Sequence, residues 1–560
     1  MVSFYKLKIM KRLSNINIST LFFAVITLAY ISFYSCKKIS NPHGNGDEKD
    51  TITYNLIKTS IYVQFIDAYT GELIIPEEGK ELKVGIVGKS KAAVVDIIGI
   101  QKEEYIAKQG FITFALNPES EFIPSSGSPV RFTIVASLNS YLTSSKEVTI
   151  TSEGDYMLRI FMVDTDNPPS GVIIKQLSEV GRLINGVLQD TVSISTPNSE
   201  AIVIIPAGAR LLDSDSVKLA TGKLNLTLYY FSNLEDQALA TFTGGITGTV
   251  IQNTSTNSGV FFPAGLVKFE ISDSEWRKAS IVENNSLTVS MAISDQTYNP
   301  VSGSNIIDGD EVALYSYISD TGLWMFDQWA TITDTLYSGF YTTVKTSRLN
   351  NYNFSWFERN NCNQGSKFKV EDNCQQCEAI MLEGIVRKQA DNSFVSNINL
   401  VGEWNEQINI PFSTGGTPVY IDWDQGNQCS YCYVDPAVSP LLIDNMCSQE
   451  LISLPLTDDS QTTMAITATF IGSCDSDTNI VVLPSFGLWI RPVDATCWRW
   501  SSMNNGVAQI CSVIYGETYV LGTYYDGKWK QWTITISNEE TYTFAIDFSQ
   551  SVCLNAFGIL

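Results

Sequence analysis

Histidine is almost absent from this chain of 560 residues, and the only one is His43, near the N-terminus. A Ser-His-Asp triad, a Cys-His pair and an H-E-x-x-H zinc site each require a histidine within the folded body. The sequence therefore excludes all three, and paired carboxylates remain as the one common hydrolytic chemistry. Nothing singles out such a pair among 59 acidic residues, so we predict no enzyme and name no catalytic residue.

Basic residues are also scarce, at 36 against 59 acidic ones, which gives a formal net charge of -23. Four of the basic residues lie before residue 36: Lys6, Lys8, Lys11 and Arg12. The rest of the chain is therefore more acidic still. A body with this charge repels phosphate backbones, because the electrostatic attraction that drives nucleic-acid binding has the wrong sign. Nucleic acid is excluded as a partner.

Helical periodicity is nearly absent, and only residues 174–187 offer a helical or mixed candidate. Short runs of alternating apolar residues recur instead, separated by Gly, Pro, Asn, Asp and Ser: 61–66, 130–135, 201–205, 224–230 and 532–536. Alternation with β-branched and aromatic residues, broken by turn formers, is typical of antiparallel sandwiches. The sequence predicts an all-β chain of tandem β-sandwich domains, Ig-like or transthyretin-like.

The N-terminus carries an uncharged apolar run over residues 21–34, preceded by basic residues and followed by Ser35-Cys36-Lys37-Lys38. The run is shorter than the roughly 20 residues of a spanning helix but suits a signal peptide. A cysteine at this boundary resembles a bacterial lipoprotein box. The resemblance implies that residues 1–35 are a signal peptide and that Cys36 becomes the lipidated first residue, held in the membrane. The alternative is an uncleaved anchor helix.

Residues 36–54 are polar after the cysteine and cannot bury a core, so we expect a lipid-anchored flexible tether that contains His43. Acidic residues soon after the lipid cysteine, here Asp47, Glu48 and Asp50, resemble the surface-export signal of Bacteroidota lipoproteins. This resemblance implies an outer-membrane lipoprotein that is exposed at the cell surface.

Three blocks follow the tether, and the breaker cluster at residues 166–171 separates the first two. In the block 55–168, the turn at residues 65–72 and the strands at 110–114 and 131–136 resemble a carboxypeptidase-regulatory-like domain. That family implies a transthyretin-like sandwich without catalysis. The block 172–357 is similar to the β-rich module that follows such domains in other envelope lipoproteins, and no chemistry is attached to it.

The block 358–560 is a Cys-rich β region, which forms either one domain or two subdomains, 358–450 and 451–560. It holds every cysteine other than Cys36: Cys362, Cys374, Cys377, Cys429, Cys432, Cys447, Cys474, Cys497, Cys511 and Cys553. An even count in one region of an exported chain predicts up to five disulfides. The two Cys-x-x-Cys pairs, at 374–377 and 429–432, leave a four-thiolate zinc site as the alternative.

Trp498 and Trp500 alternate in the sequence and would share one face of a strand. Exposed indoles stack on the apolar face of sugar rings, so these two residues are the candidate ligand contacts. The alternative is that both rings belong to the core.

Calcium is the one cofactor that the sequence leaves open, because oxygen ligands recur in loops around Asp164, Asp213 and Asp308. None of these loops matches the full EF-hand pattern, and Asp is an ordinary turn residue. We expect no metal centre. The chain is thus predicted to be a non-catalytic surface lipoprotein with a binding or architectural role, contacting a glycan or an envelope protein through its C-terminal block. A carbohydrate-active protein, either glycan-binding or a carboxylate-dependent hydrolase, is the alternative.

Overall fold

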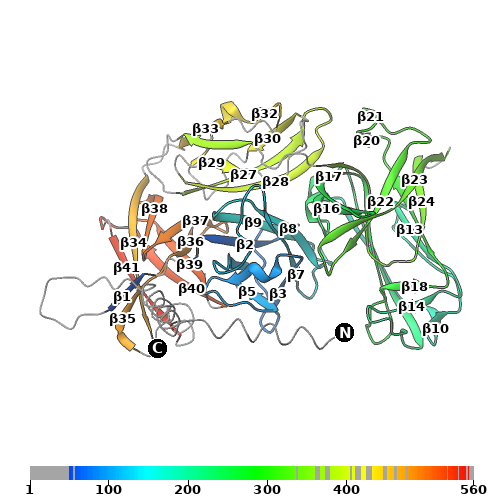
Figure 1. Ribbon diagram of the computed structural model, residues 1–560, viewed down its shortest axis with the longest axis horizontal. Coiled ribbons are helices and arrows are strands. Elements are labelled where there is room, and N and C mark those ends of the chain that lie inside the picture. The colour runs from blue at the N-terminus through cyan, green and yellow to red at the C-terminus, as the bar shows by residue number, and fades with distance from the viewer. Residues whose placement is uncertain are drawn as a thin grey trace, which may run out of the picture.

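The strands of this protein build four successive β domains, seen in a computed structural model (Figure 1). The structure describes residues 50–53, 57–335, 339–359, 366–371, 379–403, 407–409, 418–423, 432–445, 451–458, 463–474, 477–525, 527–539, 541–549 and 553. Strands dominate these residues, which confirms the predicted all-β fold of tandem sandwiches.

The first domain is a sandwich of two four-stranded sheets, ordered β4-β6-β2-β9 and β5-β3-β7-β8. Its elements are β2 (Thr59–Asp67), β3 (Leu82–Val87), η1 (Lys91–Ala93), β4 (Val94–Asp96), β5 (Glu104–Ala107), β6 (Phe111–Leu116), β7 (Val130–Ser137), β8 (Ser144–Ile150) and β9 (Gly154–Met162). Alternate side chains such as Ile61, Val63 and Phe65 point between the sheets and form the core. All nine residues of β2 are buried, so a second layer must also cover the outer face of this strand.

The second domain follows the breaker cluster, since β9 ends at Met162 and β10 begins at Val172. Its 14-stranded sheet runs β12-β13-β19-β24-β23-β22-β25-β17-β15-β10-β11-β14-β18, with β16 on β17 and β23. The elements are β10 (Val172–Ile184), β11 (Val187–Leu188), β12 (Val192–Ser195), β13 (Ala201–Ile205), β14 (Arg210–Leu212), β15 (Gly222–Phe231), α3 (Asp236–Thr241), β16 (Thr247–Gln252), β17 (Ser255–Ser272), β18 (Ile281–Glu283), β19 (Leu287–Ile293), β20 (Tyr298–Asn299), β21 (Ser304–Asn305), β22 (Glu311–Ile318), β23 (Leu323–Thr335), β24 (Gly339–Thr346) and β25 (Asn351–Arg359).

The helical or mixed candidate at 174–187 is wrong, because β10 covers most of it. Its pairing with β15 shifts register between Leu177 and Val180 and again between Val180 and Leu183. Glu179 and Gly181 adopt φ angles of 56° and 59° inside this strand. Each bulge inserts an extra residue and resets the alternation, so the apolar period of two that marks a strand disappears from the sequence.

The third domain places the sheet β29-β26-β33-β31 against the sheet β28-β27-β30-β32. Its elements are β26 (Lys367–Glu371), β27 (Ala379–Lys388), β28 (Phe394–Glu403), β29 (Gln407–Asn409), β30 (Val419–Trp423), β31 (Cys432–Val434), η2 (Pro436–Val438), β32 (Leu441–Ile443) and β33 (Leu451–Asp458). Because β33 pairs with β26 and β31, the Cys-rich block divides between Asp458 and Thr463 rather than at residue 450.

The fourth domain is a nine-stranded sheet that runs β1-β35-β34-β38-β37-β36-β39-β40, with β41 also on β34. Its elements are β34 (Thr463–Cys474), β35 (Asp477–Leu483), β36 (Phe486–Pro492), β37 (Arg499–Asn504), β38 (Val507–Ile514), β39 (Thr518–Tyr525), β40 (Lys528–Thr535) and β41 (Thr541–Phe548).

One strand of this fourth domain comes from the other end of the chain. β1 (Asp50–Thr53) pairs in parallel with β35, with Asp50 opposite Ile480 and Thr53 opposite Leu483. The expected flexible tether over 36–54 therefore has to be corrected, because residues 50–53 are a strand of the C-terminal sheet. Parallel partners are distant in sequence, so local pattern gives no sign of this pairing.

The chain thus folds back on itself, and its first and fourth domains are neighbours (Figure 1). The third domain lies over the first, with β28 against β9, and the second domain occupies the opposite end of the long axis from β1 and β35.

Candidate functional site

A cluster of aromatic rings joins the first and fourth domains, which we call the interdomain aromatic cluster. It contains Tyr62, Phe111, Met157, Trp489, Trp498, Trp500 and Val520. Phe111 lies 4.6 Å from Trp489 between ring centroids, and Tyr62 lies 5.1 Å from Trp500. Each aromatic side chain buries on the order of 150–250 Å², so this cluster supplies much of the apolar contact between the two domains.

The candidate sugar-stacking residues are part of this cluster. Trp498 is only 8% exposed and Trp500 only 4%. The two indoles therefore form no exposed platform, and the expected surface site at Trp498 and Trp500 has to be corrected. The physical reason is that β2 and β6 of the first domain present Tyr62 and Phe111 to the same face of the fourth-domain sheet, which covers it.

Close approach of the two domains depends on Gly487 in β36. A Cβ atom at this position would collide with Trp500 Nε1 and Tyr62 Cε1, and would lie 2.8 Å from Tyr62 Cζ. Carbon atoms in contact normally lie about 3.5–4.0 Å apart. The absence of a side chain at Gly487 therefore lets the Tyr62 ring reach the strand.

A cavity of about 490 Å³ lies next to this cluster, where all four domains meet, and we call it the junction cavity. The edge strands β8 and β9 contribute one wall, and residues around α3 in the second domain contribute another. β28 of the third domain lines a third side, and the fourth domain contributes Ser485, Phe486, Trp500 and residues 502–504. α3 contacts both β9 and β28, and β27 contacts β37, so contacts between domains surround the space.

Near the junction cavity, two ion pairs connect the third domain to the first and second domains. Arg159 on β9 forms an ion pair with Glu383 of the third domain and donates a 2.8 Å hydrogen bond from Nε to Gln64 Oε1. Arg387 of the third domain pairs with both carboxylate oxygens of Asp236 in α3, at 3.1 Å to Oδ1. Hydrogen-bonded and partly buried pairs of this kind stabilise a fixed geometry more than exposed pairs do.

Two neighbouring residues of β8 carry perturbed ionisable groups in the cavity lining. Burial raises the pKa of the Glu147 carboxyl, although Glu147 Oε2 and Oε1 accept bonds from Thr249 N at 2.9 Å and Oγ1 at 2.8 Å. Burial lowers the pKa of Lys146 to about 8, and its Nζ donates to the Arg159 carbonyl at 3.1 Å. Both charged groups are thus already engaged with protein partners.

No family model and no curated protein matches the chain. Among solved structures, the streptococcal ancillary pilin shows 11% identity and a TM-score of 0.14, over 44% of this chain and 94% of its own. The Bacillus anthracis TIE protein shows 10% identity and a TM-score of 0.14, over 68% of this chain and 76% of its own. The full-length major pilin RrgB from Streptococcus pneumoniae shows 8% identity and a TM-score of 0.13, over 88% of this chain and 99% of its own. At such TM-scores the similarity supports no statement about this chain's function.

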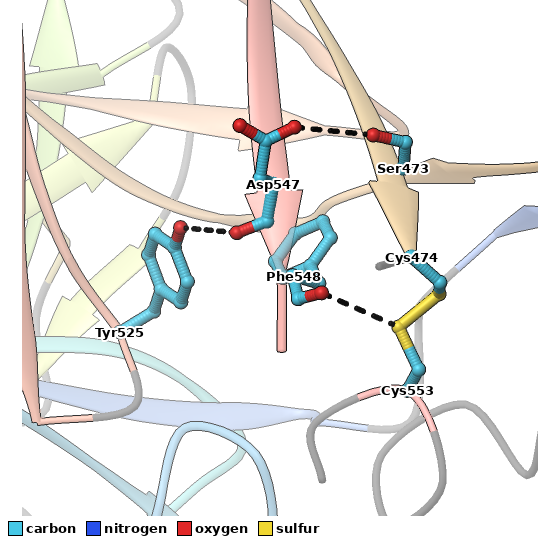
Figure 2. The surroundings of a disulfide bond; sticks show 6 residues. All are labelled: Ser473, Cys474, Tyr525, Asp547, Phe548 and Cys553. Atoms are coloured by element: carbon cyan, nitrogen blue, oxygen red, sulfur yellow. Dashed lines mark hydrogen bonds between the residues drawn. A yellow bond between two sulfur atoms is a disulfide. The ribbon is translucent and has the colours of Figure 1, made fainter. Parts of the chain in front are cut away.

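The cysteine prediction is confirmed at one pair, Cys474 with Cys553 (Figure 2). Cys474 ends β34, and the bond holds the segment after β41 against it. Asp547 of β41 lies beside the bond and accepts a 3.2 Å hydrogen bond from Ser473 Oγ. Cys497 is also disulfide-bonded, and Cys511 is half-buried on β38.

The other cysteine predictions lie outside what the structure describes. Cys36, Cys362, Cys374, Cys377, Cys429 and Cys447 fall among the residues that are not described, and for Cys432 only its place in β31 is given. The disulfides and the zinc alternative at these positions stay predictions.

The carboxylates of the calcium candidates accept hydrogen bonds from backbone N–H groups. Asp164 Oδ1 accepts from Asp166 N at 3.1 Å, and Asp213 Oδ1 accepts from Val217 N at 2.8 Å. Asp308 Oδ1 accepts from Asp334 N at 2.8 Å. Within the described residues, no three His, Cys, Asp or Glu side chains gather as a metal site would require.

Sequence reasoning missed the junction cavity, since its walls come from four domains. The sequence held one signal that the outer face of β2 is covered, because Tyr62 stands between Ile61 and Val63 and so puts a large ring on that face. In the structure the residues of both faces of β2 are buried. Among the residues that the structure describes, no helix has the length and apolar character to cross a membrane.

Proposed function

We propose that this protein is a non-catalytic cell-surface lipoprotein that displays its second domain away from the membrane. The observation that carries this proposal is the position of β1. Asp50 follows Cys36 by 14 positions and lies at the edge of the fourth-domain sheet. An extended chain covers at most about 3.3–3.6 Å per residue, so a lipid on Cys36 would keep the fourth domain within roughly 50 Å of the bilayer.

The arrangement of domains supports a proposal about which part of the molecule is presented. The second domain lies at the far end of the long axis from β1 (Figure 1). Aromatic contacts join the first domain to the fourth, and the Arg159–Glu383 ion pair joins the first domain to the third. We therefore propose an architectural role, in which the first, third and fourth domains form a base and the second domain carries the exposed contact surface. The sandwich of two four-stranded sheets in the first domain supports the proposed regulatory-like kinship, which implies no catalysis.

Lipidation is tested by feeding cells an alkyne-bearing fatty acid and comparing the full chain with its Cys36→Ala variant. We expect label on the wild-type chain and none on the variant. Equal labelling of both chains would contradict the anchor. Protease added to intact cells should cut the chain if it is displayed at the surface, and full protection would place it inside the envelope.

Orientation is tested on the lipidated chain in vesicles that contain an acceptor dye in the lipid. A donor dye is attached either at Ser302 in the second domain or at Asp494 in the fourth, both of which are exposed. We expect efficient energy transfer from position 494 and little from 302. The opposite ranking would overturn the proposed display of the second domain.

The role of β1 has its own control. In a parallel pair of strands, every second residue of β1 donates its backbone N–H to β35. Proline has no N–H, so replacing both Thr51 and Ile52 by Pro removes a donor whichever of the two residues makes this bond. We expect energy transfer from the dye at position 494 to be no longer more efficient than transfer from position 302 in this variant, whereas prolines at Gly44 and Asn45 should leave that difference unchanged. An unchanged transfer from position 494 in the Thr51→Pro, Ile52→Pro variant would show that β1 does not fix the orientation.

A further inference from the structure

Three turns of this chain share one hydrogen-bond pattern, and we call them the Asp turns. They span residues 96–100, 213–217 and 273–277, and each begins with Asp. The carboxylate of that Asp accepts bonds from the backbone N–H groups of the third and fifth residues, at 2.8–3.2 Å. Backbone bonds also join the first residue to the fourth and to the fifth. The three turns therefore differ in their side chains rather than in their backbone.

The fourth residue of each Asp turn has a positive φ. It is Gly99 at 83°, Ser216 at 61° and Trp276 at 62°. A positive φ costs glycine nothing, whereas a bulky side chain is strained there. Ser216 shows that the turn forms without a large ring, so the backbone of residues 273–277 gives no reason for a tryptophan.

Packing gives no reason for Trp276 either, because this side chain is 74% exposed. The turn beneath it is firmly held, since the Asp273 carboxylate is fully buried and also accepts bonds from Ala220 N at 2.9 Å and Arg277 Nε at 3.0 Å. The ring is thus kept in solvent on a rigid and strained backbone. Strain of this kind is typical of functional sites, where the surrounding structure holds it in place.

The ring lies on the domain whose display is proposed above. The turn 273–277 leads from β17 into β18, and the turn 213–217 follows β14, which pairs with β18. β14 and β18 lie together at one end of the second domain, far from β1 (Figure 1). A contact site here rests on the proposed function for its exposure on the cell, although binding itself needs no anchor.

The charges beside Trp276 are balanced. Arg277 pairs with Asp273 at 3.0 Å and with Glu275 at 3.5 Å, and Lys278 pairs with Glu270 at 3.1 Å. No excess of one sign therefore attracts an ion to the ring. A bilayer is disfavoured as well, because it would have to desolvate the Glu275 carboxylate, which is 67% exposed and next to the ring in the sequence.

The neighbouring Asp turn adds further polar groups. It is close because Ala220, three residues after this turn, donates to Asp273. The exposed residues of this segment include one acid, one base and one aliphatic side chain: Ser214, Asp215, Ser216, Val217 and Lys218. Ser274 is exposed on the turn of Trp276 itself. Hydroxyl and carboxylate groups that solvent can reach therefore accompany the exposed indole.

A flat indole face with such groups around it matches a sugar. One face of a pyranose consists of C–H groups, which pack against an aromatic ring, while its hydroxyls bond to carboxylates and other hydroxyls. A protein partner would need about 800 Å² from each side, several times the roughly 150–250 Å² of one aromatic side chain. We propose that Trp276 is the stacking residue of a glycan contact site, at which Glu275 accepts hydroxyls of a neutral sugar.

The test observes Trp276 directly by fluorine NMR. The full chain is labelled with fluorotryptophan and kept in a polyoxyethylene detergent, and the line of Trp276 is assigned by its loss in Trp276→Ser. The probes are cellobiose, maltose, lactose and di-N-acetylchitobiose, each up to tens of millimolar. We expect at least one of them to shift this line saturably. If no sugar moves it, the proposal is wrong, and a shift caused only by dodecylphosphocholine micelles would assign the ring to lipid headgroups instead.

Calorimetry with the sugar that binds then locates the site, and the two Asp turns supply the matched controls. Trp276→Ser should abolish saturable binding, whereas Trp329→Ser removes another exposed indole of the second domain and should leave Kd unchanged. Glu275→Ala should weaken Kd roughly 2- to 10-fold, the range for one hydrogen bond, whereas Asp215→Ala at the same position of the other turn should not. Binding that survives in Trp276→Ser would overturn the assignment of the ring.

A thermal measurement separates binding from folding. Trp276→Ser places at position 276 the residue that the neighbouring turn already has there, so it should unfold at the same or a higher temperature than wild type. A lower temperature would show that the indole stabilises its turn, which would remove the basis of the proposal. None of these measurements uses the lipid anchor, so their failure would leave the orientation test undecided, and the reverse also holds.

Discussion

Replacing Gly487 by Ala should open the interface between the first and fourth domains. The added Cβ would collide with Trp500 Nε1 and Tyr62 Cε1 and lie 2.8 Å from Tyr62 Cζ, so both rings have to retreat by about 1 Å to restore normal contact. Overpacking of this kind costs about 1–3 kcal/mol. Because the Cβ clashes with both rings, both have to move, and each is buried among further aromatic rings, so we expect the upper end of that range, about 3 kcal/mol.

The assay is urea unfolding of the full chain followed by tryptophan emission. A chain of several domains does not unfold in one two-state step, so the first transition is the quantity to compare. Trp489, Trp498 and Trp500 report on this interface, because all three leave an apolar environment when it opens. We expect the first transition of Gly487→Ala to occur at lower urea and to carry a red shift of emission.

The matched control is Gly85→Ala. Gly85 also lies within a strand, β3, but a Cβ atom there meets nothing within 4 Å. Such a substitution should change the free energy of unfolding by about 0.5 kcal/mol or less. If the first transition of Gly487→Ala occurs at the same urea concentration as that of Gly85→Ala, the close approach at Gly487 does not hold the two domains together, and the reasoning is refuted.

Three further predictions concern the disulfide, an ion pair and a buried lysine. Cys553→Ser removes the disulfide that closes a loop of 79 residues and should lower the free energy of unfolding of the fourth domain by about 4 kcal/mol, which calorimetry can check by comparing the variant with wild type, both oxidised. Glu383→Gln leaves the partly buried Arg159 without its carboxylate and should cost about 1–3 kcal/mol in urea, whereas Glu103→Gln at an exposed site should cost nothing measurable. The pKa of Lys146 is about 8 in the folded state and 10.5 for an unburied lysine, so the unfolded chain binds more protons between these values. Stability should therefore rise with pH above about 8, and Lys146→Met should flatten that rise; an equal slope in the variant would contradict the burial of this group.

The sequence predicts the class of the fold because strand formation is a local property. Runs such as Leu224, Leu226 and Leu228 alternate inward along β15, and this alternation alone marks a half-buried strand. The break between the first two domains was legible for the same reason, since two prolines and a glycine at 168–171 interrupt the pattern. Where bulges disturb the alternation, as in β10, the prediction of a helical or mixed segment was wrong.

The candidate site at Trp498 and Trp500 shows the limit of such reasoning. Alternation correctly places the two indoles on one face, but whether that face meets solvent or another domain depends on Tyr62 and Phe111, which lie 436 and 387 residues before Trp498. The sequence offered both alternatives, and tertiary packing decided for burial. The cavity beside Trp500 was beyond prediction, because its walls come from four domains.

By itself, then, the sequence determined the all-β class and the absence of a histidine-based active site, since each depends on residue types or local pattern; lipidation at Cys36 stays a prediction of the sequence. Tertiary structure alone decided that β1 joins the C-terminal sheet, that the first and fourth domains are neighbours, and that a cavity lies where the four domains meet. The physical reason is that these features arise from contacts between residues hundreds of positions apart. Such contacts form wherever complementary apolar faces and charges meet, and no local pattern along the chain records which faces those are.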